Sequence, residues 1–176
     1  MIDLRSLVRS IPDHPKPGIV FRDVTTLFAH AEGFAQAIEA LRARHAASRV
    51  DLVAGIEARG FVVGAALAHA LGAGFVPLRK AGKLPAETIG HDYELEYGTD
   101  RIEVHVDALR AGQRVLLVDD LIATGGTALA GLELARRLGT ELIEACFLID
   151  LPELGGRARL RATGLESFAL MSFEGH

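Results

Sequence analysis

The chain has 176 residues, of which 49% are hydrophobic, so it contains enough apolar side chains for one sizeable hydrophobic core. Its formal net charge of −4 at pH 7 argues against a nucleic-acid-binding protein, which normally carries a basic surplus. A single cysteine, Cys146, excludes an intramolecular disulfide and fits a reducing compartment. We therefore expect one compact domain, residues 1–176, that acts on a small molecule rather than on nucleic acid.

The N-terminal segment, residues 1–32, is expected to form a cap. Its first residues, "MIDLRSLVRS", are too charged for a signal peptide, and no later apolar run approaches the roughly 20 residues that span a bilayer. These features predict a cytoplasmic protein without a membrane contact. The stretch "IPDHPKPGIVFRD" (11–23) contains three prolines, which fix backbone dihedrals and exclude a helix. This part of the cap is therefore expected to be extended and stiff.

The rest of the chain alternates short apolar runs with longer amphipathic ones. Runs rich in Val, Ile and Leu predict buried strands at 50–56, 74–78, 114–120 and 141–149. Apolar residues at helical spacing, followed by Gly72 or Gly139 in two cases, predict helices at 33–46, 60–72 and 127–139. Repeated strand-helix units predict an α/β fold, a doubly wound and mostly parallel sheet with helices on both faces.

One segment, residues 79–107, breaks this alternation. It contains two strand-like stretches, at 93–97 and 101–106, which are separated by Gly98. In both stretches apolar or aromatic residues alternate with polar ones, as in a strand with one covered face. We expect this segment to form a flexible flap or hairpin inserted between two strands of the sheet.

The stretch "RVLLVDDLIATGGTAL" (114–129) places two adjacent carboxylates before a glycine-rich turn. In open parallel sheets ligands bind beyond the carboxyl ends of the strands, where this stretch lies. Gly125 and Gly126 let a ligand approach the backbone, and the N–H groups that begin the next helix suit a phosphate. Ionised Asp119 and Asp120 only accept hydrogen bonds, so they suit vicinal hydroxyls. Ribose 5-phosphate presents both groups, although acidic pairs also hold bare metal ions and Gly-Gly also forms simple tight connections.

Two further segments carry basic residues at strand ends. "VAGIEARGFVVG" places Arg59 and Gly60 after a buried strand, where a guanidinium suits an oxyanion such as diphosphate. A surface ion pair between Arg59 and Glu57 is the simpler alternative. "RKAGKLP" lacks core periodicity and fits a lid that closes over a charged substrate, although exposed cations also serve solubility. Its cations are Arg79, Lys80 and Lys83.

Several long stretches, spread over nearly the whole chain, match one known family. They are "PDHPKPGIVFRDVTTLF", "AGIEARGFVVG", "PLRKAGKLPAETI", "YELEYG" and "DALRAGQRVLLVDDLIATGGT". The string "VLLVDDLIATGGT" is similar to the phosphoribosyl diphosphate signature of the type I phosphoribosyltransferases, and the whole set resembles the adenine-specific members of that family. The resemblance implies a ribose 5-phosphate site at Asp119, Asp120, Ala123, Thr124, Gly125, Gly126 and Thr127. It implies a diphosphate site at Arg59, Gly60, Arg79, Lys80 and Lys83.

The resemblance also implies the reaction, in which adenine and 5-phospho-α-D-ribose 1-diphosphate give AMP and diphosphate in purine salvage. Mg²⁺ is the implied cofactor, held by substrate oxygens and water with no direct protein ligand, and the implied assembly is a homodimer. The backbone of Val20 and Arg22 is expected to read the edge of adenine, while Phe21 packs on its face. Tyr97 is expected beside the reaction centre, and Glu96 at adenine N7 as an acid/base. The implied catalytic residues are Glu96, Arg59, Lys83, Asp119 and Asp120.

Two other functions remain open from the sequence. The acceptor base can differ, with hypoxanthine, guanine, xanthine or orotate in place of adenine. A 6-oxopurine enzyme is expected to carry a lysine and an aromatic residue in the strand after the phosphate loop, but "EACFLIDLPELGG" (144–156) offers Phe147 and no lysine. The second alternative is a non-catalytic sensor of the diphosphate donor. The lack of a basic surplus counts against a DNA-bound sensor.

Overall fold

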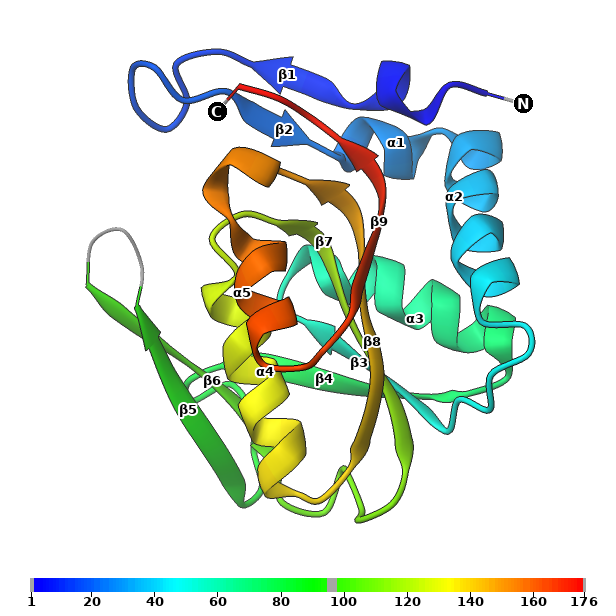
Figure 1. Ribbon diagram of the computed structural model, residues 1–176, viewed down its shortest axis with the longest axis vertical. Coiled ribbons are helices and arrows are strands. Elements are labelled where there is room, and N and C mark those ends of the chain that lie inside the picture. Colours follow the sequence, from blue (N-terminus) through cyan, green and yellow to red (C-terminus); the bar gives the residue numbers. More distant parts are fainter. Residues whose placement is uncertain (1, 95–97, 176) are drawn as a thin grey trace.

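The computed structural model describes residues 2–94 and 98–175, and in this part of the chain a central sheet has seven strands (Figure 1). Their order is β5-β6-β4-β3-β7-β8-β9. The pairs β4–β3, β3–β7, β7–β8 and β8–β9 are parallel, whereas β5–β6 and β6–β4 are antiparallel. The mostly parallel sheet expected from the sequence is therefore confirmed. The strands are β3 (Leu52–Ile56), β4 (Gly74–Lys80), β5 (Thr88–Glu94), β6 (Thr99–His105), β7 (Arg114–Ile122), β8 (Glu141–Asp150) and β9 (Ser167–Ser172).

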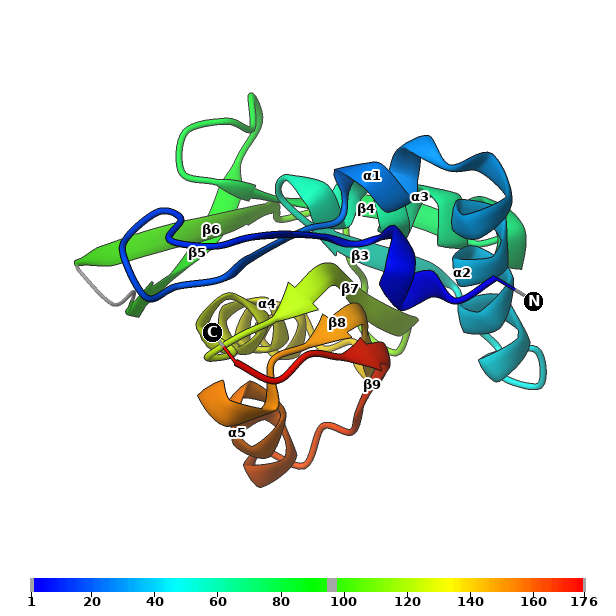
Figure 2. The ribbon, with the colours of Figure 1, turned by 90° about the horizontal axis from the view of Figure 1, so that it is seen from above.

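Helices cover both faces of the sheet, as Figure 2 shows from above. Helices α2 (Ala31–Arg44) and α3 (Arg59–Leu71) pack on one face, and α4 (Gly126–Arg137) and α5 (Gly156–Ala162) pack on the other. Strand β7 supplies both cores, because successive side chains of a strand point to opposite faces. Val115 and Leu117 face α4, whereas Leu116 and Val118 face the α2 and α3 side. This double burial explains why β7 reads as a continuous apolar run.

The helices follow the spacing that the sequence indicated. In α2, Ala37, Ile38 and Leu41 are buried, and burying a large apolar side chain contributes about 1.5–3 kcal/mol. Helix α3 stops at Gly72, which has a φ of 66° and adopts the left-handed conformation that glycine tolerates best. Cys146 is fully buried in the core.

The N-terminal segment is more folded than the sequence indicated. It contains η1 (Leu4–Leu7), an antiparallel pair of short strands and α1 (Thr25–Ala29); the strands are β1 (Arg9–Ile11) and β2 (Phe21–Asp23). The expectation of one extended stretch over 11–23 is therefore wrong for its middle, where the chain turns back between the strands. Asp23 connects the two strands at the base of this hairpin, where it accepts hydrogen bonds from the Thr25 hydroxyl and from Arg9. These hydrogen bonds lower the pKa of Asp23 to about 2.

Strands β5 and β6 form the antiparallel hairpin expected in the 79–107 segment, but their bounds differ from the predicted ones. The first strand spans residues 88–94 rather than 93–97, and β6 continues the sheet by pairing with β4. Ile102 and Val104 of β6 are fully buried in the core on the α4 side of the sheet. Their burial anchors the hairpin to the edge of the sheet. The predicted site residues Glu96 and Tyr97 lie outside the described residues.

After β8, three further elements were not anticipated from the sequence, namely η2 (Pro152–Leu154), α5 and β9. Helix α5 spans only seven residues, too few to establish a helical period, and β9 was hidden because its residues are mostly half-buried. None of the helices in the described part of the chain is long and apolar enough to cross a membrane.

Candidate active site

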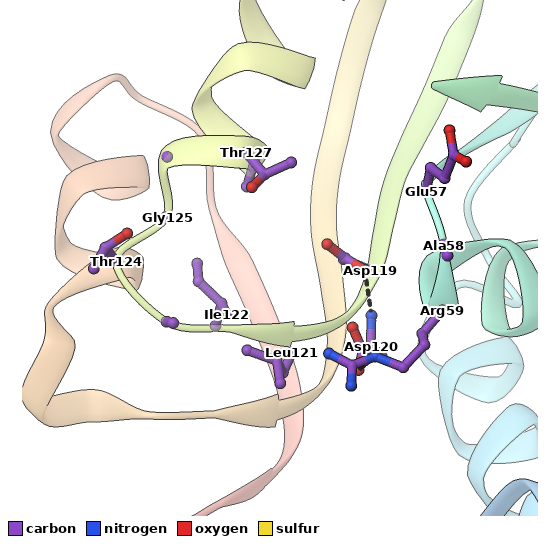
Figure 3. Close-up of a pocket in the computed structure, with 13 residues that line it drawn as sticks. Glu57, Ala58, Arg59, Asp119, Asp120, Leu121, Ile122, Thr124, Gly125 and Thr127 are labelled. Carbon is purple, nitrogen blue, oxygen red and sulfur yellow. Dashed lines mark hydrogen bonds and ion pairs between the residues drawn. The ribbon is translucent and has the colours of Figure 1, made fainter. Parts of the chain in front are cut away.

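A cavity of about 510 Å³ lies at the carboxyl ends of β3 and β7 (Figure 3). The β3–α3 and β7–α4 connections form it, as expected for the ligand site of an open parallel sheet. It brings together seven of the residues predicted for the ribose 5-phosphate and one predicted for the diphosphate. The lining residues are Glu57, Ala58, Arg59, Asp119, Asp120, Leu121, Ile122, Ala123, Thr124, Gly125, Gly126, Thr127 and Ala128.

The floor of the cavity is the turn between β7 and α4. Strand β7 continues to Ile122, two residues past the predicted end at residue 120, so Asp119 and Asp120 lie within the strand. Gly125 has a φ of 81°, and α4 begins at the next residue. No side chain caps this helix, so its first backbone N–H groups are available to a ligand in the cavity.

Glycines allow the two walls of the cavity to approach each other. A Cβ on Gly60 would lie 2.8 Å from the Asp119 carboxylate and 2.9 Å from the backbone oxygen of Val118. Only glycine therefore fits the first turn of α3 beside β7. Gly60 does not line the cavity itself; it sits behind Asp119. Gly156, which the sequence did not indicate, packs in the same way against the backbone of Ala123 and Gly125.

The two carboxylates differ in their partners. Asp119 Oδ1 accepts a hydrogen bond from the Asp120 backbone N–H at 2.8 Å, and Asp120 Oδ2 forms an ion pair with Arg59 Nε at 2.7 Å. Burial and the charge of Asp120 raise the pKa of Asp119. Burial also raises the pKa of Asp120, but the Arg59 guanidinium opposes this rise. Arg59 therefore favours the ionised form of Asp120, although the net shift of the Asp120 pKa is still upward.

The observed ion pairs exclude the simpler alternative for Arg59, a surface ion pair with Glu57. This arginine does not pair with Glu57; it reaches across the cavity to Asp120 (Figure 3). Glu57 pairs instead with Arg79 at 3.3 Å and accepts the Lys80 backbone N–H at 2.9 Å. Both interactions outweigh the effect of burial and lower the pKa of Glu57.

The other predicted diphosphate ligands do not line the cavity. Arg79 and Lys80 lie in β4, which extends past the predicted end at residue 78. The Lys80 ammonium contacts the Asp100 carboxylate and the Tyr93 hydroxyl of the hairpin. Lys83 is exposed. No local sequence pattern indicates Asp100 as a partner of Lys80, because this pairing depends on the β4–β6 register.

Of the predicted base-site residues that the structure describes, Phe21 lies against Arg59, the cation that pairs with Asp120. Its ring centroid is 5.2 Å from the Arg59 guanidinium carbon and 5.3 Å from the His14 ring. The Arg22 side chain points elsewhere: it donates to Ser10 Oγ and to the backbone oxygen of Glu174. Neither Arg22 nor Val20 lines the cavity, and Arg22 does not pair with Asp23.

Comparison with known proteins agrees with this geometry. A family model described as the phosphoribosyl transferase domain matches residues 23–166, so the chain belongs to the phosphoribosyltransferase family. The chain is 58% identical to the adenine phosphoribosyltransferase of Parvibaculum lavamentivorans over 99% of this chain and 100% of that protein. It is 60% identical to the adenine phosphoribosyltransferase of Methylorubrum extorquens, over 98% and 96% of the two chains.

Solved structures show the same likeness. The adenine phosphoribosyltransferase of Thermoanaerobacter pseudethanolicus superposes with a TM-score of 0.93 at 48% identity, covering 97% of this chain and 98% of that one. The Saccharomyces cerevisiae enzyme, complexed with an imino-altritol bisphosphate and adenine, gives a TM-score of 0.91 at 40% identity over 96% and 97%. The resemblance to the adenine phosphoribosyltransferases and their fold is therefore confirmed.

Proposed function

We propose that this protein is the enzyme that transfers the 5-phosphoribosyl group of 5-phospho-α-D-ribose 1-diphosphate to adenine, giving AMP and diphosphate in purine salvage. The observation that carries the proposal is that two carboxylates and an uncapped helix N-terminus line the same cavity. The high identity to proteins named adenine phosphoribosyltransferase over nearly their full length supports the choice of base.

The cavity accounts for the ribose 5-phosphate end of the donor. The phosphate accepts hydrogen bonds from the backbone N–H groups at the turn formed by Ala123, Thr124, Gly125, Gly126 and Thr127. The sugar hydroxyls donate to Asp119 and Asp120. Acids and phosphate loop therefore hold opposite ends of one ligand, and the sugar is fixed with its anomeric carbon toward the base.

The leaving diphosphate requires cations, and Arg59 is the one already in the cavity. Arg59 exchanges Asp120 for the diphosphate when the donor binds, while Lys80, Lys83 and Arg79 approach from β4 and the segment after it. Gly60 contributes by letting the start of α3 approach the donor. These cations stabilise the charge that develops on the diphosphate as its bond to the sugar breaks.

We propose Mg²⁺ as the cofactor, bound with the donor. The residues fit Mg²⁺, because the carboxylate oxygens of Asp119 and Asp120 are of the hard kind that this ion prefers. These carboxylates act on the ion through the sugar hydroxyls or through bound water rather than as direct ligands. When bound, Mg²⁺ neutralises part of the diphosphate charge. We also propose that the protein works as a homodimer in the cytoplasm, which sedimentation or light scattering of the purified protein tests.

At the base, Phe21 packs against one face of adenine, and the backbone of Val20 and Arg22 reads its edge. Adenine N9 bonds to the anomeric carbon as the bond from that carbon to diphosphate breaks, and the N9 proton passes to solvent. Glu96 holds a proton at N7, and Tyr97 lies beside the reaction centre. A carboxyl group in a closed apolar site keeps its proton near neutral pH, which this role requires.

An assay over a panel of nucleobases tests the proposal. The purified protein is incubated with the donor, Mg²⁺ and one base at a time, and both nucleotide and diphosphate are quantified. We expect equal amounts of AMP and diphosphate with adenine, and much slower turnover with hypoxanthine, guanine, xanthine or orotate. Binding of the donor without turnover of any base would identify a sensor instead.

A further inference from the structure

A buried polar cluster lies apart from the substrate cavity, between α2 and β8. It consists of His45, Glu144 and Cys146, which are 3%, 6% and 0% exposed. In the described part of the chain, these are the residues found to bring three possible metal-ligand atoms within 4.8 Å of one another. None of them lines the substrate cavity.

The separations of the three ligand atoms match a metal centre. His45 Nε2 is 3.3 Å from Cys146 Sγ and 3.3 Å from Glu144 Oε2, and Sγ is 3.8 Å from Oε2. A point equidistant from these atoms lies about 2 Å from each, close to the roughly 2.0–2.3 Å of zinc bonds to nitrogen, oxygen and sulfur. We propose that His45, Glu144 and Cys146 form a structural Zn²⁺ site.

The surroundings supply an orienting partner and an entry path. Arg44 donates two hydrogen bonds to Glu144, at 2.7 and 2.6 Å, and its guanidinium lies 4.1 Å from the Phe168 ring centroid. Both oxygens of the Glu144 carboxylate are therefore held in position by Arg44, as metal ligands usually are by a neighbouring hydrogen-bonding group.

A cavity of about 300 Å³ opens beside the cluster, lined by Arg44, His45, Ser48, Ile143 and Glu144. Through it a cation reaches the three ligands, and water from it fills the fourth position of a tetrahedral site. On binding, the Cys146 thiol loses its proton to solvent and the neutral His45 ring carries its proton on Nδ1, so a thiolate, an imidazole nitrogen and a carboxylate face the ion. Zinc is favoured over Mg²⁺ or Ca²⁺ because two of the three ligands are nitrogen and sulfur.

The position in the fold indicates what the ion does. Cys146 pairs with Val118 across the β7–β8 ladder, and the next residue, Phe147, pairs with Asp119. The ion ties the end of α2 to this ladder and stabilises the strand that carries the substrate carboxylates. We therefore expect zinc to raise the thermal unfolding temperature, with the metal-free protein still able to bind the donor.

Cobalt substitution tests the site directly. Co²⁺ is added to metal-free full-length protein, and the thiolate-to-cobalt charge-transfer band in the near ultraviolet is recorded. Because the chain has one cysteine, such a band reports on Cys146 alone. We expect one Co²⁺ per chain with this band, and its loss in Cys146→Ser. Absence of the band in the wild type at saturating Co²⁺ would show a hydrogen-bonded trio only and overturn the proposal.

Zinc affinity provides a second test that does not depend on the cysteine variant. Competition with a chromophoric chelator measures zinc affinity in the wild type, in His45→Asn and in His69→Asn, a matched variant of an exposed histidine on α3. We expect zinc affinity at least about tenfold weaker in His45→Asn and unchanged in His69→Asn. Equal affinities in all three proteins would place zinc elsewhere and contradict the site.

Discussion

Two regions of the molecule carry the charges that we propose bind one substrate, and the two regions differ in how far their charged groups are already in place. The β7–α4 turn lines the cavity with its carboxylates, glycines and free helix N-terminus already together. In the β4–β6 region, by contrast, Arg79 is paired with Glu57 and Lys80 with Asp100. The proposed sugar-phosphate site is therefore preformed, whereas these two cations, which we propose bind the diphosphate, must first leave their internal partners.

The largest expected effect comes from the preformed region. Asp120→Asn removes a charged acceptor for a ribose hydroxyl and the partner that orients Arg59. We expect kcat/KM to fall by about 10²–10³-fold, in line with the loss of one preorganised polar contact. Steady-state AMP formation measures it, and the exposed Asp107→Asn serves as control. A loss of less than about threefold would contradict the claim that the β7–α4 turn is a preformed site.

The next effect tests the close approach of α3 to β7. In Gly60→Ala, the new Cβ meets the Asp119 carboxylate and the Val118 backbone, so the strand or helix must shift. We expect at least about a tenfold loss of kcat/KM, although alanine by itself favours a helix by about 1 kcal/mol. Ala65→Gly, an exposed position of the same helix, should lower stability but keep activity per folded molecule. Full activity in Gly60→Ala would show that the approach is not needed.

The third effect probes the region whose cations are engaged. Asp100→Asn removes the ion-pair partner of Lys80, so the ammonium reaches the diphosphate at a smaller cost. We expect the KM for the donor to fall by up to about fivefold, because a half-exposed ion pair contributes about 1 kcal/mol or less. Asp92→Asn, in an exposed pair of the same hairpin, is the matched control. A higher KM in Asp100→Asn would mean that this pair positions Lys80 rather than withholding it.

The smallest effect concerns stability and pH. The lowered pKa of Glu57 contributes stability that is present above its ordinary pKa of 4.5 and is lost as pH falls through the lowered value. Glu57→Gln should therefore be less stable than the wild type by about 1 kcal/mol or less at pH 7, and the difference should vanish in acid. Urea unfolding at several pH values measures it. A difference that persists at pH 2 would point to packing instead of charge.

The sequence predicted the parts of the molecule that depend on local pattern. Apolar runs located four core strands, and the β7–α4 motif located the cavity residues. The internal partners were not predictable, because the Lys80–Asp100 and Glu57–Arg79 pairs arise from strand register and from a β4 that runs past residue 78. The role of Gly156 was not predictable for a similar reason, since this residue acts through its contact with a turn some thirty positions earlier.

The central claim is that Asp119 and Asp120 bind the hydroxyls of the sugar phosphate. Its most direct test is a binding cycle that removes either the carboxylates or a sugar hydroxyl. Calorimetry compares ribose 5-phosphate with 2-deoxyribose 5-phosphate on the wild type and on the double variant Asp119→Asn/Asp120→Asn. If the acids hold the sugar hydroxyls, loss of the 2-hydroxyl should weaken binding by roughly tenfold in the wild type and little in the variant. Equal losses in both proteins would show that the carboxylates do not read the hydroxyls.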